Sequence, residues 1–291
     1  MIVLDSGKQS PIYSVSLAAG GRRLAAVRGG LYHPWFDVWD VSAAARTRAA
    51  GSGVMTGMLA HPTRDVLLLW GRDGLAVAGP DDLAPAVTDA VHLMELAVAG
   101  DRLVGLAHRP PGRLLVGWGW AGDRPERRWQ VGGDDLWEQL TAAPAGEWFA
   151  VRCGRVVGAT VEVRASDAGR LLAAGAIPTD AGLLAVLGRG TAVLASAGRV
   201  LLFDPHTGRE VAAVKPPGAG AVRGAAVAPD GRQVLACKDK AVYALDPETL
   251  AVRRAYTFPA RGKPTCLAVA PDGLTAACGT TRGEVVVFDL D

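Results

Sequence analysis

Short apolar runs, separated by turn residues, follow one another along the whole chain. The last three of these runs are Thr265–Ala270, Leu274–Gly279 and Glu284–Asp289. Pro271-Asp272-Gly273 separates the first two, and this sequence favours a tight turn because proline presets φ and glycine accepts a positive φ. The pattern therefore predicts a three-stranded antiparallel meander. An open sheet edge invites pairing, and Met1–Asp5 is a strand-like run without a hairpin partner nearby, so we expect it to be the fourth strand.

The same plan recurs upstream. The range Ala228–Asp246 is a close copy of Ala270–Asp291, and weaker copies of the turn continue back to Gly20-Gly21. Together they give seven units of roughly 40 residues, a period typical of four-stranded propeller blades. The sequence therefore predicts one all-β domain over residues 1–291, a seven-bladed β-propeller with four-stranded antiparallel blades. The N-terminal strand is expected to close the ring by pairing with the last blade.

The first strand of each unit is short, nearly continuously apolar and rich in small residues, as expected for strands that are crowded around a central axis and covered on both faces. These predicted inner strands are Ile12–Leu17, Met55–Ala60, Leu93–Ala99, Trp137–Ala142, Leu183–Leu187, Gly224–Ala228 and Cys266–Ala270. The fourth strands are more polar, which fits an outer edge that faces solvent.

The third strand of several units ends in an apolar residue followed by an acid. The examples are Val38-Trp39-Asp40, Phe203-Asp204-Pro205, Leu245-Asp246-Pro247 and Phe288-Asp289. With the Pro-Asp-Gly turns, this pattern resembles the WD-repeat superfamily of β-propellers, and bacterial propellers with looser repeats match equally well. The resemblance implies a propeller fold and, by analogy, an interaction platform. The family's Gly-His pair before the inner strand is absent from every unit. We therefore expect its buried His–Trp hydrogen-bond network to be missing and the blades to be held by packing.

Composition excludes several classes of protein. The formal net charge is +2, which argues against a polycation that coats nucleic acid. No apolar run reaches the roughly 18 residues of a membrane span, and no secretory signal is apparent, so we expect a cytoplasmic protein without membrane contact. The four cysteines, Cys153, Cys237, Cys266 and Cys278, lie in strand-like runs and are interpreted as reduced core thiols, with a disulfide between Cys266 and Cys278 as the alternative.

The sequence contains no recognisable catalytic or metal-binding constellation. Its five histidines fall in different units without ligand-like spacing, and no Gly-x-Ser-x-Gly elbow or phosphate-binding loop occurs. No catalytic residue, metal ligand or cofactor is therefore predicted. Trp118 and Trp120 are spaced to share one strand face, either as a stacking platform for a flat ligand or, more commonly, as packing between blades. An enzyme or small-ligand binder that uses the central mouth remains the alternative function.

Topology places many basic residues on one face of the propeller. The loops between second and third strands hold Arg28, Arg72, Arg109, Arg113, Arg152, Arg155, Arg199, Lys238, Lys240 and Arg282. These loops share a face with the connections between units, and acids in other connections leave the basic sector over the last two units and the first. A basic mouth attracts acidic partners, and at physiological salt this attraction is screened beyond about 8 Å.

The segment Tyr32–Phe36 lies in this sector and is interpreted as a long aromatic loop, and aromatic and arginine side chains commonly anchor interfaces. The predicted function is non-catalytic docking of a protein or peptide, possibly acidic, as a subunit of a larger bacterial-type assembly, with nucleic acid as an unlikely partner. The predicted partner-binding residues are Arg28, Tyr32, His33, Trp35, Lys238, Lys240 and Arg282.

Overall fold

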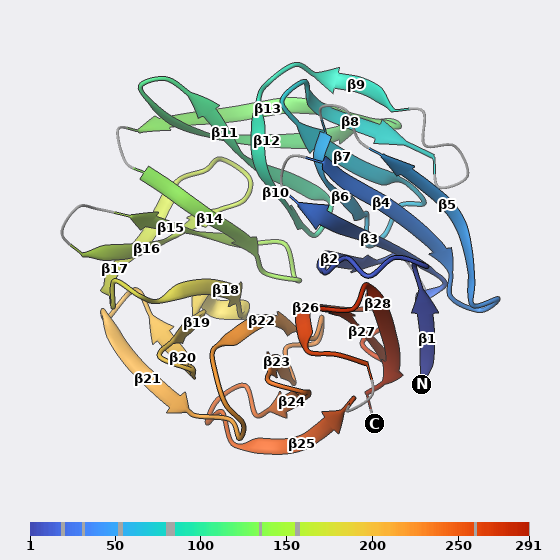
Figure 1. Ribbon diagram of the computed structural model, residues 1–291. Helices are drawn as coiled ribbons and strands as arrows, with labels where there is room; N and C mark the ends of the chain where they lie inside the picture. The colour runs from blue at the N-terminus through green and yellow to red at the C-terminus, as the bar shows by residue number, and fades with distance from the viewer. Residues whose placement is uncertain are drawn as a thin grey trace.

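The computed structural model describes residues 1–18, 21–30, 33–51, 55–79, 85–133, 136–154, 158–258 and 261–290. For residues 30, 33, 48–51, 136 and 189 it describes the backbone alone. The strands form seven four-stranded antiparallel sheets arranged in a ring (Figure 1). This confirms the predicted seven-bladed β-propeller.

Blades 1 to 4 follow one another along the chain. Blade 1 contains β2 (Ile12–Leu17), β3 (Arg23–Gly30), β4 (His33–Asp40) and β5 (Ala45–Gly51). Blade 2 contains β6 (Met55–Ala60), β7 (Leu67–Gly71), β8 (Gly74–Ala78) and β9 (Ala86–Asp89). Blade 3 contains β10 (Leu93–Ala99), β11 (Arg102–Arg109), β12 (Gly112–Ala121) and β13 (Arg124–Gly133). Blade 4 contains β14 (Leu136–Ala142), β15 (Trp148–Gly154), β16 (Ala159–Ala165) and β17 (Leu171–Ile177).

Blades 5 to 7 complete the ring. Blade 5 contains β18 (Gly182–Val186), the short 3₁₀ helix η2 (Gly188–Gly190), β19 (Ala192–Ser196), β20 (Arg199–Asp204) and β21 (Arg209–Val214). Blade 6 contains β22 (Val222–Val227), β23 (Val234–Lys238), β24 (Ala241–Leu245) and β25 (Val252–Thr257). Blade 7 contains β26 (Pro264–Val269), β27 (Thr275–Thr280), β28 (Glu284–Asp289) and β1 (Ile2–Asp5).

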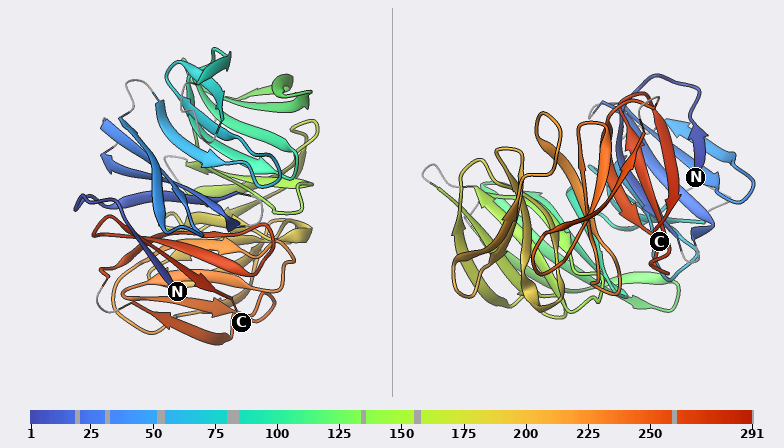
Figure 2. Two further views of the ribbon diagram at one scale, coloured as in Figure 1. Left: turned by 90° about the vertical axis from the view of Figure 1, so that its right-hand side faces the viewer. Right: turned by 90° about the horizontal axis from the view of Figure 1, so that it is seen from below.

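The first strand of each of these blades lies toward the middle of the ring, and the fourth lies at its outer edge (Figure 1). Loops between second and third strands, and the connections between blades, lie on one side, which we call the top face. The remaining loops form the lower face. Seen from the side, the blades form a thick disc, and the two chain ends lie close together in every view (Figure 2).

The ring is closed by the predicted pairing of the N-terminal strand. β1 runs antiparallel to β28, with Ile2 opposite Val287 and Asp5 opposite Glu284. The Leu4 side chain is 1% exposed and packs into the core between blades 7 and 1. In the turn before β28, Gly283 has a φ of +81° and lies so close to the chain leaving β1 that a Cβ would stand 2.2 Å from the Lys8 carbonyl oxygen. The closure is therefore built from both ends of the chain.

Buried apolar side chains form seven clusters, and each cluster lies between two neighbouring blades. Polar side chains of the inner strands add to this packing, so the expectation that packing alone holds the blades is incomplete. The Leu140 N–H donates to Oε2 of Glu95 across blades 3 and 4 at 2.6 Å, and the Leu183 N–H donates to Oε1 of Gln139 across blades 4 and 5 at 2.8 Å. Between blades 7 and 1, the Thr265 hydroxyl donates to the Ile12 carbonyl at 2.6 Å.

All four cysteines are free, as the interpretation of reduced core thiols predicts. Cys266 lies opposite Gly279 in the sheet, one position away from the pair that Leu267 and Cys278 form. Burial raises the pKa of the Cys237 and Cys266 thiols to about 12, so both are protonated at neutral pH. No helix in the described part of the chain is long and apolar enough to cross a membrane.

Candidate functional site

Every inner strand carries one extra residue near its top end. In each blade, the pairing between first and second strands skips one inner-strand position, which is a β-bulge. The skipped residues are Tyr13, Thr56, Met94, Glu138, Leu184, Arg223 and Thr265, in order from blade 1 to blade 7. Because the bulges occupy corresponding places in all seven blades, these residues form a ring at the top opening of the propeller. We call them the mouth ring.

The mouth ring presents its side chains to solvent. Tyr13 is 58% exposed and Met94 is 41% exposed, whereas their strand neighbours Ile12 and Leu93 are completely buried. Thr56, Glu138 and Arg223 are also exposed, and Leu184 and Thr265 are half-buried. Large side chains that are excluded both from the sheet pairing and from the core are available for contact with another molecule. The sequence analysis missed this ring because a bulge is defined by the partner strand.

Several basic residues of the top face turn inward. The Arg152 guanidinium donates to the Thr179 and Ala181 carbonyls, each at 2.8 Å, and forms an ion pair with Glu138. Arg113 donates to the Trp137 carbonyl. These carbonyls belong to the connections and strand starts of the next blade, where the sheets leave acceptors unpaired. Some of the basic side chains of the top loops are therefore structural, because they donate hydrogen bonds to backbone carbonyl groups that the sheets leave unpaired.

Lys238, a predicted partner-binding residue, serves the same purpose. Its side chain is completely buried, and its ammonium donates to the carbonyls of Gly198 at 2.9 Å and Pro216 at 2.8 Å. Burial, followed by the nearby charge of Lys215, lowers the pKa of Lys238, while Asp239 opposes this change. Lys238 thus ties blade 6 to blade 5 and offers no charge to a partner.

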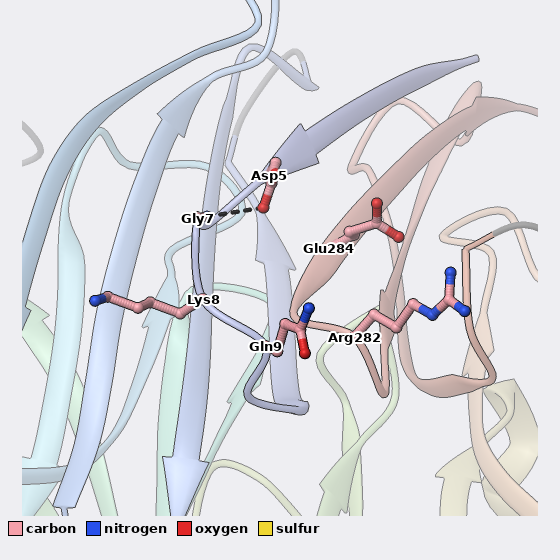
Figure 3. Close-up of a pocket in the computed structure, with 6 residues that line it drawn as sticks. All are labelled: Asp5, Gly7, Lys8, Gln9, Arg282 and Glu284. Carbon is pink, nitrogen blue, oxygen red and sulfur yellow. Dashed lines mark hydrogen bonds between the residues drawn. The ribbon is translucent and has the colours of Figure 1, made fainter.

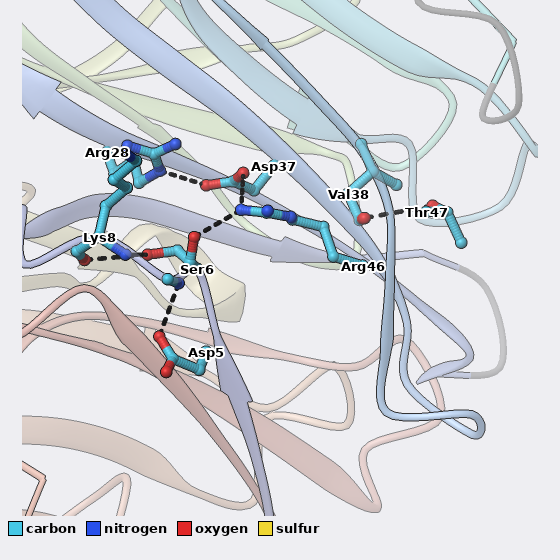
Figure 4. A network of polar contacts seen from close by, with 9 residues as sticks. Asp5, Ser6, Lys8, Arg28, Asp37, Val38, Arg46 and Thr47 are labelled. Carbon is cyan, nitrogen blue, oxygen red and sulfur yellow. Dashed lines mark hydrogen bonds and ion pairs between the residues drawn. The ribbon is translucent and has the colours of Figure 1, made fainter.

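Arg28, another predicted contact residue, belongs to a buried polar network (Figure 4). Its Nε lies 2.6 Å from Oδ2 of Asp37, and both side chains are almost fully buried. Arg46 contacts the other carboxylate oxygen of Asp37 at 3.3 Å and donates to the Ser6 carbonyl at 2.5 Å. The network thereby connects blade 1 to the end of β1. Arg28 also lies 5.1 Å below the ring centroid of Trp35, a cation–π distance that fixes the tryptophan in place.

The other predicted contact residues differ in whether the structure describes their side chains and in how exposed these are. Trp35 is 45% exposed, and Lys240 and Arg282 are exposed on the top face. Tyr32 lies outside the described residues, and only the backbone of His33 is described. The predicted long aromatic loop is wrong, because β3 continues to Gly30 and β4 begins at His33. Residues 33–36 pair with residues 27–30 of β3, so most of the segment is strand and not loop.

Exposed basic side chains gather over blades 6, 7 and 1, as the sequence analysis predicts. These residues, which we call the basic sector, are Lys8, Arg223, Lys240, Lys263 and Arg282. Lys263 lies 3.2 Å from Asp239. Among the residues that the structure describes, Arg223 and Lys240 have no ion pair. The basic sector adjoins the exposed aromatic residues Tyr13 and Trp35 of blade 1.

A polar hollow of about 610 Å³ lies at the edge of this sector, where the chain leaves β1 (Figure 3). Its lining includes Asp5, Lys8, Arg282 and Glu284. The Asp5 carboxylate accepts the Gly7 N–H at 2.7 Å, and the Glu284 carboxylate pairs with Arg261 at 3.1 Å. Both acids are thus engaged within the protein, while Lys8 points away from Arg282 (Figure 3). The polar lining of this hollow is therefore continuous with the surface of the basic sector.

The tryptophan pair of β12 has a structural role. Trp118 is 1% exposed, and its indole N–H donates to Asp89 at 2.8 Å. Trp120 lies under the Arg64 guanidinium, whose carbon is 4.2 Å from the ring centroid, and against the His61 ring. This supports packing between blades rather than a stacking platform. In the described ranges, no three His, Cys, Asp or Glu side chains come together as a candidate metal site.

Glu95 makes the stability of the ring dependent on pH. Burial raises the pKa of this carboxyl to about 7, although the Leu140 N–H and Arg113 favour its charged form. A raised folded-state pKa gives stability that is complete below the unfolded value of about 4.5 and is lost as pH rises through about 7. Gln139 accepts the corresponding hydrogen bond in the next blade without a charge.

We therefore expect Glu95→Gln to stabilise the protein at pH 8 by about 3 kcal/mol and to change little at pH 4.5. Urea denaturation at both pH values measures this difference, with Gln139→Glu as the matched reverse variant, which should lose stability at pH 8. Equal stability of wild type and Glu95→Gln at pH 8 would contradict the assignment.

A comparison with models of known protein families finds no model that matches this chain, and a comparison with curated proteins finds no match. The β-propeller architecture follows from the strand pairing, and the likeness to WD repeats remains a resemblance.

Proposed function

We propose that the protein is a non-catalytic docking module that binds a protein or peptide segment at the mouth ring. The observation that carries this proposal is the set of seven corresponding bulges, each of which places one residue that is skipped by the sheet pairing at the same opening. A rigid ring of strands beneath them keeps the positions fixed, which lowers the entropic cost of binding.

The chemistry of the mouth favours a partner segment with both apolar and acidic residues. Tyr13, Trp35 and Met94 offer exposed apolar surface over blades 1 to 3, and aromatic residues are common binding hot spots. Arg223 and Lys240 supply positive charge from blade 6. Complementary charge increases association rates and specificity, and its effect weakens as salt rises. We infer an acidic partner for this reason.

By analogy with other propellers, we place the protein in a larger cytoplasmic assembly of a bacterial type. The fold itself hosts many functions, so this part of the proposal rests on analogy.

Affinity purification from the native host tests the docking proposal. We expect Tyr13→Ala combined with Trp35→Ala, and Arg223→Glu combined with Lys240→Glu, each to reduce recovery of the main partner by about tenfold or more. Recovery with wild type should also fall when salt is raised. Leu274→Ala is the matched control, because Leu274 is 66% exposed on the lower face. Undiminished recovery with both mouth variants, in folded protein, would rule out this face as the docking surface.

A further inference from the structure

A second candidate surface lies on the lower face, between blades 5 and 6. A hollow of about 520 Å³ is lined there by the apolar side chains Leu187, Leu202, Val211 and Pro247 and by the acids Asp230 and Glu248. We call this hollow the lower groove. It opens on the face opposite the mouth ring, so it belongs to neither the mouth ring nor the basic sector.

The apolar part of the lower groove combines buried and exposed residues. Leu187 and Leu202 are 7% and 2% exposed and belong to the core between the two blades. Val211, on the outer strand β21, is 59% exposed beside them. A large part of an aliphatic side chain thus remains uncovered at the place where the core reaches the surface. An apolar side chain from another molecule would cover it.

Of the two acids in the lower groove, Glu248 is not used by the fold. The Asp246 carboxylate fixes the turn that follows β24 by accepting the N–H groups of Glu248 at 2.9 Å and Thr249 at 2.8 Å. The Glu248 carboxylate takes no part in this turn and has no ion pair among the described residues. The Asp230 carboxylate accepts the Arg232 N–H at 2.9 Å within its turn. It also pairs with the Arg232 side chain at 3.6 Å, but both side chains are well exposed, so this ion pair is weak and leaves the charge of Asp230 open to a partner. Among the side chains that the structure describes, no lysine or arginine lines the groove.

The corresponding turn of blade 5 shows that the glutamate is not needed for the turn. There Asp204 accepts the His206 N–H at 2.9 Å and the Thr207 hydroxyl at 2.9 Å, in the same arrangement as Asp246. His206 occupies the position that Glu248 occupies in blade 6. The negative charge is therefore a property of the lower groove rather than a requirement of the local backbone.

We propose that the lower groove docks a basic and apolar segment of a partner protein. The segment would place an aliphatic side chain of about the size of valine or leucine over Val211, and a neighbouring lysine or arginine beside Glu248 and Asp230. Charge complementarity selects this occupant, because the described lining of the groove contains two carboxylates and no lysine or arginine. This second docking surface has the opposite charge preference to the mouth and does not depend on it.

Binding of short synthetic peptides to the intact protein tests this proposal. The probe is a fluorescein-labelled hexapeptide of sequence Gly-Val-Lys-Leu-Arg-Gly, and the charge-reversed probe carries Glu and Asp in place of Lys and Arg. Fluorescence anisotropy should show saturable binding of the basic peptide and at least tenfold weaker binding of the acidic one. Glu248→Lys and Val211→Ser should each weaken binding of the basic peptide by at least about tenfold.

Two controls keep the result specific. His206→Lys adds the same charge at the matching turn of blade 5 and should change the affinity by less than twofold. Tyr13→Ala combined with Trp35→Ala should leave it unchanged, which separates this proposal from the docking function of the mouth. The proposal is overturned if the basic peptide does not bind up to millimolar concentration, if Glu248→Lys leaves binding intact, or if the mouth variant abolishes it.

Discussion

Deletion of residues 1–5 is expected to destabilise the protein by at least about 5 kcal/mol, which corresponds to a fall in melting temperature of about 10 °C for a chain of this size. The deletion removes Leu4, whose burial between blades 7 and 1 alone is worth about 2–5 kcal/mol. It also leaves β28 as an unpaired edge, which invites aggregation. Differential scanning calorimetry and light scattering measure the two effects.

A circular permutant provides the control for this deletion. In the native pairing, Ile2 lies opposite Val287, so the end of β28 and the start of β1 are adjacent. Joining the C-terminus to Met1 and opening the chain at Ser10 would turn the two strands into a hairpin. This permutant should keep a melting temperature within a few degrees of wild type. A deletion variant as stable as wild type would show that β1 does not hold the ring closed.

Replacement of Asp37 by alanine is expected to cost about 3–5 kcal/mol of unfolding free energy, because the buried Arg28 guanidinium then loses its counter-charge. Asp37 is completely buried and holds both Arg28 and Arg46 (Figure 4). The loss should also loosen Trp35, which rests on Arg28. Urea denaturation measures the stability, and acrylamide quenching of tryptophan fluorescence, with Trp35→Phe as the reference that removes the Trp35 signal, reports the accessibility of Trp35.

The double variant Arg28→Met with Asp37→Leu separates a missing charge from a disrupted core. Apolar replacement of a buried ion pair is often neutral, so this variant should recover most of the stability that Asp37→Ala loses. A cost below about 1 kcal/mol for Asp37→Ala would mean that the network contributes little to the closure of the ring.

The fold could be predicted from the sequence because its signals are local and repeated. Short apolar runs, glycine and proline at turns, and a unit length of roughly 40 residues define the blades, and the unpaired run Met1–Asp5 points to the closure. The WD-like ending at Trp39-Asp40 adds to this picture, since Trp39 is 1% exposed in the core beside blade 7.

The candidate site was harder to predict, for two physical reasons. Arg28 and Lys238 are charged residues at the ends of predicted loops, but both side chains are buried in the structure. Arg28 pairs with the buried Asp37 carboxylate, and Lys238 donates to two backbone carbonyl groups outside its own blade. The mouth ring depends on bulges, and a bulge exists only in relation to the partner strand. A weak signal was present at one position, since Arg223 interrupts the otherwise apolar β22.

Hydrogen exchange of the protein with and without its purified partner tests the docking proposal most directly. The proposal predicts that partner binding slows amide exchange around the mouth-ring residues Tyr13, Met94 and Arg223, while the lower-face turn at 271–274, which lies outside the lower groove, exchanges at an unchanged rate. Protection confined to the lower face or to the outer strands, with an unprotected mouth, would contradict it.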